Sequence, residues 1–311
     1  MDLIQTRGSR HWREDISSMA MPNISITSVE INGSLAYVNY SIEAVEGGYT
    51  SLTLVAKKNS APTSKTDGVT ATITQSSTGK LMYLNNSSTY YFAIFAEYNG
   101  YTFRTPVVSY NTQSEITFVD TEIRNGVMYN KATGLTLDIF AGNPTIGYDS
   151  ANNAISIYGY RSTDQAGFIL HDKKWGQVER TKASIISHEA NVKVTMSSSQ
   201  NLSLNSITSF SMTGSGYAIT ISPNNASYRL FSGGAPLRNK LNAFHKVKVN
   251  VYYRNTGKAY KCEIYVDDVL TNQSTFSDVN DDRDGYTLAP YSSERGYMYF
   301  KNMKVTAIYN D

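Results

Sequence analysis

Apolar and polar positions alternate with a period of two along much of the chain, which is the spacing of side chains on a β-strand. The densest example is Thr89–Tyr98, and four of its side chains share one face of an extended strand: Tyr90, Phe92, Ile94 and Ala96. The dipeptide Asn99-Gly100 that follows is typical of a tight hairpin turn. Because Tyr101–Val108 then continues as a second apolar stretch, we expect a hairpin with both faces largely covered.

Residues 22–112 are predicted to form short strands separated by turns. The strands are expected at Ile24–Ile31, Leu35–Glu43, Tyr49–Lys57, Val69–Thr74, Thr89–Tyr98 and Tyr101–Tyr110. Glycine, proline and asparagine favour breaks at Asn32-Gly33, Gly47-Gly48, Pro62–Gly68 and Asn99-Gly100. Several strands at this short spacing predict a β-sandwich.

The segment Leu84–Tyr90 resembles a motif of the fibronectin type III family, which places a Leu six residues before a Tyr at the start of its sixth strand. The resemblance covers residues 22–112 and implies that the Tyr90 hydroxyl bonds back to nearby backbone, an arrangement known as a tyrosine corner. The sequence departs from the family in having Tyr40 where a Trp is usual and in lacking the usual Pro and Gly before Tyr90. The family resemblance implies a spacer or adhesion module.

In residues 113–311 helical periodicity is nearly absent, and the clearest alternation lies near the C-terminal end. Apolar residues alternate with polar ones in His245–Tyr253 and again in Tyr260–Asp267, on either side of the turn Arg254–Gly257. Two amphipathic strands joined by a tight turn predict an antiparallel hairpin with one face in water.

The last predicted strand is Tyr297–Ile308, with a phase shift near Lys301-Asn302 that indicates a β-bulge. This end of the chain resembles the concanavalin A-like (laminin G-like) lectin fold, whose penultimate hairpin has the form aromatic-His-x-Val-x-Val, a turn, and Tyr-Val-Asp-Gly. The corresponding stretches are Phe244–Val249 and Tyr265–Asp268, and Phe300–Val305 resembles the usual final strand. The resemblance implies a two-sheet jelly-roll sandwich that is frequently sugar-binding; the match to residues 113–240 is weak.

These patterns predict an all-β fold in three sections: an N-terminal arm at 1–21, a fibronectin type III-like, immunoglobulin-like sandwich at 22–112, and a jelly-roll lectin-like sandwich at 113–311. The arm places Trp12 between Arg10 and Arg13 in a polar context. We expect it to dock on a partner protein; folding back onto its own domain is the alternative.

Composition narrows the function. Hydrophobic residues make up 41% of the chain and charged residues only 17%, so neutral polar groups and the 24 tyrosines must cover much of the surface. A net charge of +2 gives no electrostatic footprint for nucleic acid. Cys262 has no second cysteine to pair with, and its position on the apolar phase of a strand predicts a small buried hydrophobe. Neither a secretion signal nor a membrane-spanning run is recognised.

A catalytic site is not expected. Glycosidases on this sandwich need two carboxyl groups about 5–9.5 Å apart. Glu263 and Asp267 share a face, yet the rise of a strand separates them by about 13 Å. The histidines are scattered without zinc spacing: His11, His171, His188 and His245. Of these, His245 is predicted to be a core-edge imidazole.

Calcium is the one cofactor that the sequence suggests. Asn280, Asp282 and Asp284 alternate before Gly285, which resembles the start of a calcium loop. Tyr291 occupies the position where such a loop has its last Glu. A solvated acidic turn without metal is therefore the alternative.

For a sugar, the candidates are aromatic residues that lie beside polar ones, because a ring covers the apolar face of a sugar while polar groups bond its hydroxyls. Trp175 with Asp172, and Tyr286 with Tyr291, meet this description. A packing role is the alternative for Trp175.

A fibronectin-like module followed by a lectin-like sandwich, low in charge and cysteine, is similar to exterior proteins of tailed bacteriophages. The resemblance implies a non-enzymatic virion protein of the tail, baseplate or collar, or a capsid fibre or decoration, made in the host cytoplasm. Its arm would dock on other virion proteins, and its C-terminal sandwich would contact host glycans or neighbouring subunits in a homo-oligomeric or multi-copy assembly. The alternatives are a bacterial cell-surface carbohydrate-binding protein and a glycoside hydrolase.

Overall fold

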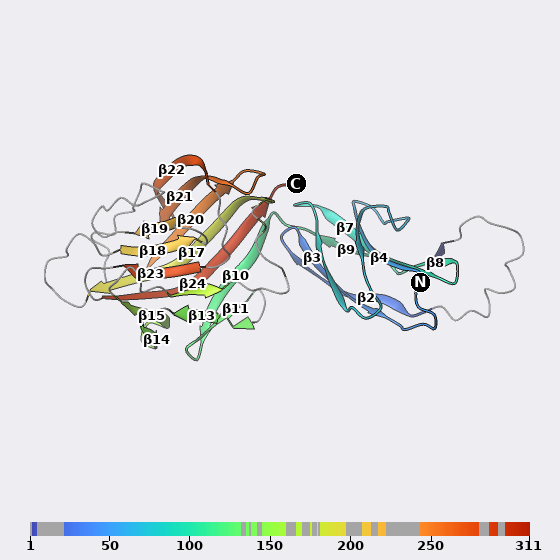
Figure 1. Cartoon of the computed structure of the whole chain (residues 1–311), viewed down its shortest axis with the longest axis horizontal. Coiled ribbons are helices and arrows are strands. Elements are labelled where there is room, and N and C mark those ends of the chain that lie inside the picture. Colours follow the sequence, from blue (N-terminus) through green and yellow to red (C-terminus); the bar gives the residue numbers. More distant parts are fainter. Residues whose placement is uncertain are drawn as a thin grey trace, which may run out of the picture. The chain divides into compact units, whose positions relative to one another are not determined.

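The computed structural model is all-β, as the alternation predicts. It describes residues 2–4, 22–131, 135–136, 138–141, 145–159, 166–169, 175, 179, 181–196, 207–212, 217–221, 243–279, 286–291 and 296–311. The chain divides into two compact units, Met1–Ile116 with Asp311 and Thr117–Asn310 (Figure 1). Over the described residues, no helix has the length and hydrophobicity needed to cross a membrane.

The first unit contains two sheets. One has the order β1-β8-β7-β4-β5, with β9 also paired to β7. Its strands are β1 (Asp2–Ile4), β4 (Ser51–Lys58), β5 (Val69–Thr72), β7 (Thr89–Tyr98), β8 (Tyr101–Arg104) and β9 (Val108–Asn111). The other has the order β2-β3-β6, formed by β2 (Ile24–Asn32), β3 (Leu35–Ile42) and β6 (Gly79–Tyr83).

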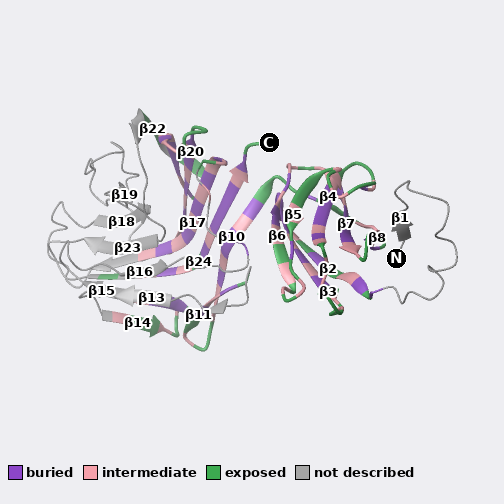
Figure 2. Ribbon diagram, turned by 45° about the vertical axis from the view of Figure 1, so that its right-hand side comes forward, coloured by how far each residue is buried: buried purple, intermediate pink, exposed green. Residues whose placement is uncertain are grey.

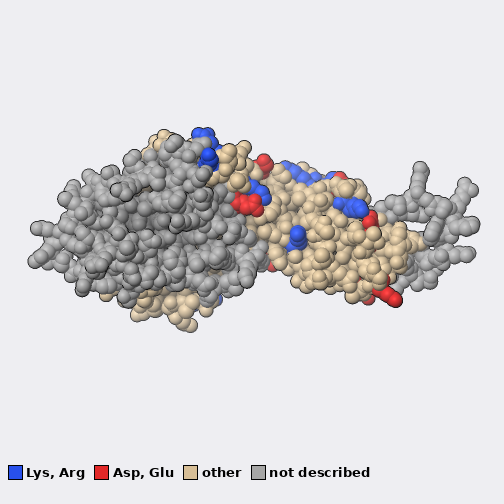
Figure 3. All heavy atoms as spheres, viewed as in Figure 1, with Lys and Arg blue, Asp and Glu red and all other residues tan. Residues whose placement is uncertain are grey.

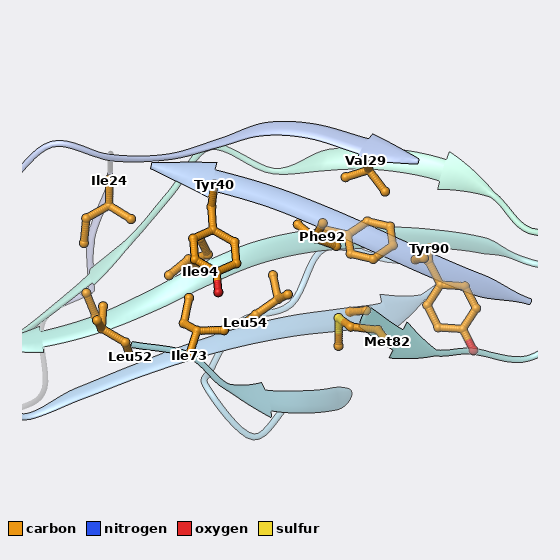
Figure 4. Packing of buried hydrophobic residues seen from close by; sticks show 14 of the residues in the cluster. Ile24, Val29, Tyr40, Leu52, Leu54, Ile73, Met82, Tyr90, Phe92 and Ile94 are labelled. Atoms are coloured by element: carbon orange, nitrogen blue, oxygen red, sulfur yellow. The ribbon is translucent and has the colours of Figure 1, made fainter. Parts of the chain in front are cut away.

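The core of the first unit lies between these two sheets. Tyr40 of β3 and Met82 of β6 meet Leu54 of β4 and Phe92 and Ile94 of β7, all of them buried (Figure 4). The inward residues of each strand are two apart in sequence, because successive side chains of a strand point to opposite faces. This packing makes the first unit a β-sandwich of the immunoglobulin-like kind.

Tyr90 forms the predicted tyrosine corner. Its hydroxyl accepts a hydrogen bond from the backbone N–H of Asn85 at 3.0 Å and donates to the Asn85 side-chain oxygen at 2.8 Å. The ring itself is buried at the edge of the core. Tyr40 is buried as well and lies with its hydroxyl 2.8 Å from Ser77 Oγ.

Two details of the first unit differ from the prediction. The stretch Tyr101–Tyr110 is two strands, β8 and β9, which pair with different parts of β7. Pro106 has no N–H to give to a ladder, and next to it the Thr105 hydroxyl accepts from the Ile94 N–H at 2.9 Å, in place of a backbone carbonyl. The short strand β6 was not predicted.

The N-terminal residues Asp2–Ile4 pair with β8 in register from Asp2 opposite Arg104 to Ile4 opposite Thr102. This part of the chain therefore folds back on its own unit, which is the alternative given for the arm. The predicted docking residues Arg10, Trp12 and Arg13 lie outside the described residues.

The second unit also contains two sheets. The larger runs β12-β11-β10-β24-β17-β20-β21-β22, with β15 paired to β24 and β14 to β15. Its strands are β10 (Glu115–Arg124), β11 (Val127–Asn130), β12 (Leu135–Thr136), β14 (Thr145–Asp149), β15 (Ala154–Gly159), β17 (Ala183–Met196), β20 (His245–Tyr253), β21 (Ala259–Val266), β22 (Val269–Val279) and β24 (Gly296–Tyr309). The smaller runs β13-β16-β23-β18-β19, and its strands are β13 (Asp138–Ala141), β16 (Ala166–Ile169), β18 (Ile207–Met212), β19 (Tyr217–Ile221) and β23 (Tyr286–Tyr291).

One face of the larger sheet is apolar and buried. Along β17, β20 and β24 buried and partly exposed residues alternate (Figure 2). The buried set includes Ile186, Val192, Val247, Val249, Val251, Cys262, Ile264, Phe300, Val305 and Ala307. The predicted hairpin β20–β21 and the predicted burial of Cys262 are both confirmed.

The predicted bulge in the last strand is present. Glu189 and Asn191, two residues apart on β17, lie opposite Lys304 and Lys301, three residues apart on β24. Asn302 in the extra position has a φ of 53°, a conformation that Asn tolerates better than most residues. The bulge keeps Lys301 and Lys304 on the same face of the sheet although their separation in sequence is odd.

Candidate functional site

The other face of the larger sheet, opposite its apolar side, carries polar and aromatic side chains, and we name it the polar face. Its register follows from strand pairing: Ser187 of β17 lies opposite Asn250 of β20, which lies opposite Glu263 of β21. Alternate residues complete the face. They are Glu189, Asn191 and Lys193 on β17, Lys246, Lys248 and Tyr252 on β20, Lys261 and Tyr265 on β21, and Tyr297, Tyr299, Lys301 and Lys304 on β24.

Glu263 is the centre of a hydrogen-bonded cluster on the polar face. Its carboxylate accepts from the Tyr252 hydroxyl at 2.6 Å, from the Tyr265 hydroxyl at 2.9 Å and from the Lys261 ammonium at 2.6 Å. Glu263 is only 8% exposed, so these side chains cover it. The sequence places Glu263 and Lys261 two apart on one strand and brings Tyr252 across from β20, which is why the groups converge.

The cluster fixes the charge of its members. Burial by itself would raise the pKa of Glu263, but the Lys261 ammonium and the two tyrosine hydroxyls outweigh it and lower that pKa to about 2. Burial raises the pKa of Tyr252 to about 12, and the Glu263 carboxylate, which accepts a hydrogen bond from the Tyr252 hydroxyl, adds to this rise. Around neutral pH the cluster therefore holds one carboxylate, one ammonium and neutral tyrosines.

Cations and rings extend this cluster toward the hairpin turn. The Lys261 ammonium lies 4.7 Å from the centre of the Tyr252 ring, and the Arg254 guanidinium lies 4.5 Å from the centre of the Tyr260 ring. The two rings meet edge to face with their centres 6.5 Å apart. Such contacts hold side chains in fixed positions on an otherwise open sheet.

A second aromatic group occupies the end of the polar face where β24 meets β17. Tyr297 and Tyr299 are stacked, with ring centres 5.9 Å apart, and Tyr297 is 42% exposed. The Lys193 ammonium lies 5.1 Å from the centre of the Tyr299 ring, and the Lys301 ammonium lies 4.3 Å from the centre of the Phe244 ring.

The rim of the face at the β21–β22 turn carries ion pairs. Asp267 and Asp268 both have positive φ, which makes a two-residue turn between Val266 and Val269. His245 Nδ1 lies 2.9 Å from Asp267, and the Lys246 ammonium lies 2.9 Å from Asp268 and 3.4 Å from Glu189. Glu263 and Asp267 thus bind different neighbours: Glu263 bonds to Tyr252, Tyr265 and Lys261, and Asp267 lies beside His245.

Of the residues predicted from the sequence to bind sugar, those that the structure describes do not belong to the polar face. Trp175 is 4% exposed, so its ring faces are covered and its burial fits the packing role. Tyr286 and Tyr291 begin and end β23, opposite Met212 and Ile207 of β18. Asp172 lies outside the described residues, as do the predicted calcium ligands Asn280, Asp282 and Asp284. Among the described residues, no three His, Cys, Asp or Glu side chains are grouped to hold a metal ion.

The alternation in Tyr260–Asp267 puts Lys261, Glu263 and Tyr265 on the face predicted to lie in water, but no site was predicted from them. The alternation in β20 puts Lys248, Asn250 and Tyr252 on the same face of the hairpin. This concentration of polar and aromatic residues could have indicated the site from the sequence. Tyr297 and Tyr299 could not be added, because nothing local in the sequence says that β24 pairs with β17.

Comparisons with known proteins do not assign a family. No family model matches the chain, and no curated protein is similar to it. Among solved structures, it is similar to the binding domain of botulinum neurotoxin DC in complex with SialylT, at 12% identity and a TM-score of 0.41 over 63% of this chain; the match spans about half (48%) of the neurotoxin chain. It is also similar to the alginate lyase AlyC3, at 11% identity and a TM-score of 0.32 over 61% of this chain and 89% of the lyase.

Proposed function

We propose that this protein is a non-enzymatic adhesion protein whose second unit binds glycans on its polar face. The observation that carries the proposal is the combination, on one sheet, of tyrosine rings with hydroxyl, amide, carboxylate and ammonium groups. A sugar has the same two characters, since its ring carries apolar C–H groups and its rim carries hydroxyls.

The polar face suits this task because its groups are already held in place. Glu263 fixes Tyr252 and Tyr265, and the Ser187 hydroxyl donates to the Asn250 side-chain oxygen at 2.7 Å. Side chains that are ordered before binding lose less entropy when a ligand arrives. The polar face also lies on the central strands of the sheet, which hold side chains more rigidly than loops do.

Binding without catalysis is favoured by the state of Glu263. A glycosidase acid needs a raised pKa and a second carboxylate about 5–9.5 Å away. The pKa of Glu263 is lowered to about 2, so it stays ionised. Its described partners are two tyrosines and a lysine, which suits a structural and binding role.

For the setting, we propose the exterior of a tailed-bacteriophage particle, with the first unit as a fibronectin type III-like spacer. The tyrosine corner at Tyr90 and the sheets β2-β3-β6 and β5-β4-β7-β8 support the spacer. Charged groups are few among neutral residues on the face of the first unit seen in Figure 3, which suits a spacer better than a charged docking surface. A bacterial cell-surface carbohydrate-binding protein would use the polar face in the same way.

A glycan microarray probed with the whole labelled protein tests the binding proposal. We expect a restricted set of glycans to give signal, and we expect Tyr299→Ala to reduce it. Val127→Ala is the matched control, since Val127 is an exposed apolar residue of β11 in the same unit. An array without signal from the folded protein would reject the proposal.

The setting has its own test. Gold-labelled antibodies raised against the protein should decorate intact phage particles released from bacteria that carry its gene, as seen by electron microscopy. Labelling of the bacterial surface instead would favour the alternative location.

A further inference from the structure

We propose that Lys193 and Lys301 form an anion site for a carboxylate-bearing saccharide, whose sugar ring lies on the stacked tyrosines Tyr297 and Tyr299. This inference rests on the proposed glycan-binding function and specifies the ligand class for one end of the polar face. We name this group of residues the lysine–tyrosine corner; it also includes Phe244 and Asn152.

The two ammonium groups of the corner approach the same neighbours. The Lys301 ammonium donates to the backbone carbonyl of Asn152 at 2.9 Å, and the Lys193 ammonium lies 3.5 Å from the Asn152 side-chain oxygen. Both also lie over the Phe244 ring, at 4.3 Å for Lys301 and 5.8 Å for Lys193. Two positive charges, one from β17 and one from β24, therefore share Asn152 and Phe244 as neighbours.

Unlike Lys261 and Lys246 on the same face, Lys193 and Lys301 have no acidic partner within ion-pair distance among the described residues. Lys261 pairs with Glu263 at 2.6 Å, and Lys246 pairs with Asp268 at 2.9 Å. Lys193 and Lys301 contact neutral oxygens and ring faces instead. A carboxylate that bridged the two ammonium groups would gain charge-assisted hydrogen bonds and would relieve their mutual repulsion.

Asp149, an acidic residue that Lys193 influences electrostatically, is engaged by the turn that follows it. Asp149 accepts from the backbone N–H of Ala151 at 3.0 Å and from the Asn152 side chain at 2.6 Å. These hydrogen bonds lower its pKa, with Lys193 contributing at longer range. Asp149 therefore orders the turn that carries Asn152, and Asn152 in turn positions both lysines.

The tyrosines beside the lysines select a sugar over a simple anion. Tyr299 lies opposite Lys193 on the neighbouring strand, and Tyr297 extends the stack toward solvent with 42% of its surface exposed. A sugar ring laid on this stack would place a carboxyl substituent near the ammonium groups. A long polyanion such as nucleic acid fits less well, because Glu189 and Glu263 lie on the same face and the net charge of the chain is only +2.

The test compares matched acidic and neutral sugars by calorimetric titration of the whole protein. The pairs are tetragalacturonate with its methyl ester, and sialyllactose with lactose. We expect the acidic member of at least one pair to bind more tightly, and we expect added salt to weaken it. The double substitution Lys193→Gln with Lys301→Gln should weaken acidic-sugar binding about ten-fold, as loss of charged hydrogen bonds predicts.

Lys131→Gln is the control, because Lys131 is a lysine of the same unit whose ammonium pairs with Asp120 at 2.9 Å; it should leave binding unchanged. If neutral sugars bind as well as acidic ones, the inference fails while the proposed function stands. If the microarray and all four sugars give no binding, both fail. A single-stranded oligonucleotide that bound more tightly than the acidic sugars, and equally well after Tyr297→Ala, would also overturn the inference.

Discussion

The core of the first unit and the polar face of the second use aromatic side chains in opposite ways. In the first unit Tyr40, Tyr90 and Phe92 point between two sheets and are exposed by 3% or less (Figure 4). In the second unit Tyr265 and Tyr299 stand on the polar face of a sheet whose other face forms the core.

This difference teaches that the same residue type contributes to different properties in the two units. A ring packed between sheets is removed from water and stabilises the fold. A ring on a polar face keeps part of its surface in water, where it contributes little to folding and remains available to a ligand. Substitutions in the two units should therefore separate stability from binding.

The largest expected effect comes from Phe92→Ala in the core of the first unit. Phe92 is fully buried in the main core, so the substitution removes its packing and leaves a cavity. We expect a loss of about 3–5 kcal/mol in the free energy of unfolding of this unit. Scanning calorimetry measures it, with the exposed Val69→Ala as the control; a loss below about 1 kcal/mol would contradict the packing described above.

Glu263→Gln tests the charged cluster of the polar face through its dependence on pH. The pKa of Glu263 falls from 4.5 to about 2 in the folded protein, so its ionised form stabilises the fold above pH 4.5 and this contribution is lost as the pH falls toward 2. At neutral pH we expect the free energy of unfolding of the wild type to exceed that of the variant by on the order of 2 kcal/mol, a value reduced for the water at this face. Urea unfolding at several pH values should show the difference shrink in acid; a constant difference would contradict the assigned pKa.

Alternation predicted the fold well wherever one face of a strand is buried. The bounds of β7 and β20 agree with the sequence pattern, and the bulge at Asn302 was visible as a change of phase. The short strand β6 was not predicted, because it begins at a glycine and Met82 is its one buried residue, so it shows no alternation. The predicted strand Tyr101–Tyr110 should have been divided at Pro106, because proline has no N–H to donate to a ladder.

The candidate site could be predicted only in part, because a site on a sheet depends on which strands are neighbours. The hairpin β20–β21 is local, so its wet face was legible in the sequence. The pairing of β17 with β24 joins residues more than a hundred positions apart, and only this pairing puts Lys193 beside Tyr299. The sequence directed attention to Trp175 as an aromatic residue beside Asp172, yet polar neighbours in the sequence do not distinguish a buried ring from an exposed one.

Tyr90→Phe sharpens the account of the first unit with a smaller effect. The variant keeps the buried ring and removes the hydroxyl that links Asn85 to the corner. We expect a loss of about 1–2 kcal/mol in the free energy of unfolding, because two hydrogen bonds of about 1 kcal/mol or less each are removed, with no change in glycan binding. Calorimetry measures the first quantity and the microarray the second; a loss as large as that of Phe92→Ala would mean that the corner organises the whole unit.

The double variant Tyr297→Ala with Tyr299→Ala should have the smallest effect on stability. Both rings lie on the polar face and stack on each other, so their loss should change the free energy of unfolding by no more than about 0.5 kcal/mol per residue. Glycan binding should nevertheless fall, because these rings form the surface on which we place the sugar. If the double variant unfolded as readily as Phe92→Ala, the stack would belong to the core and the two units would not differ in how they use their aromatic residues.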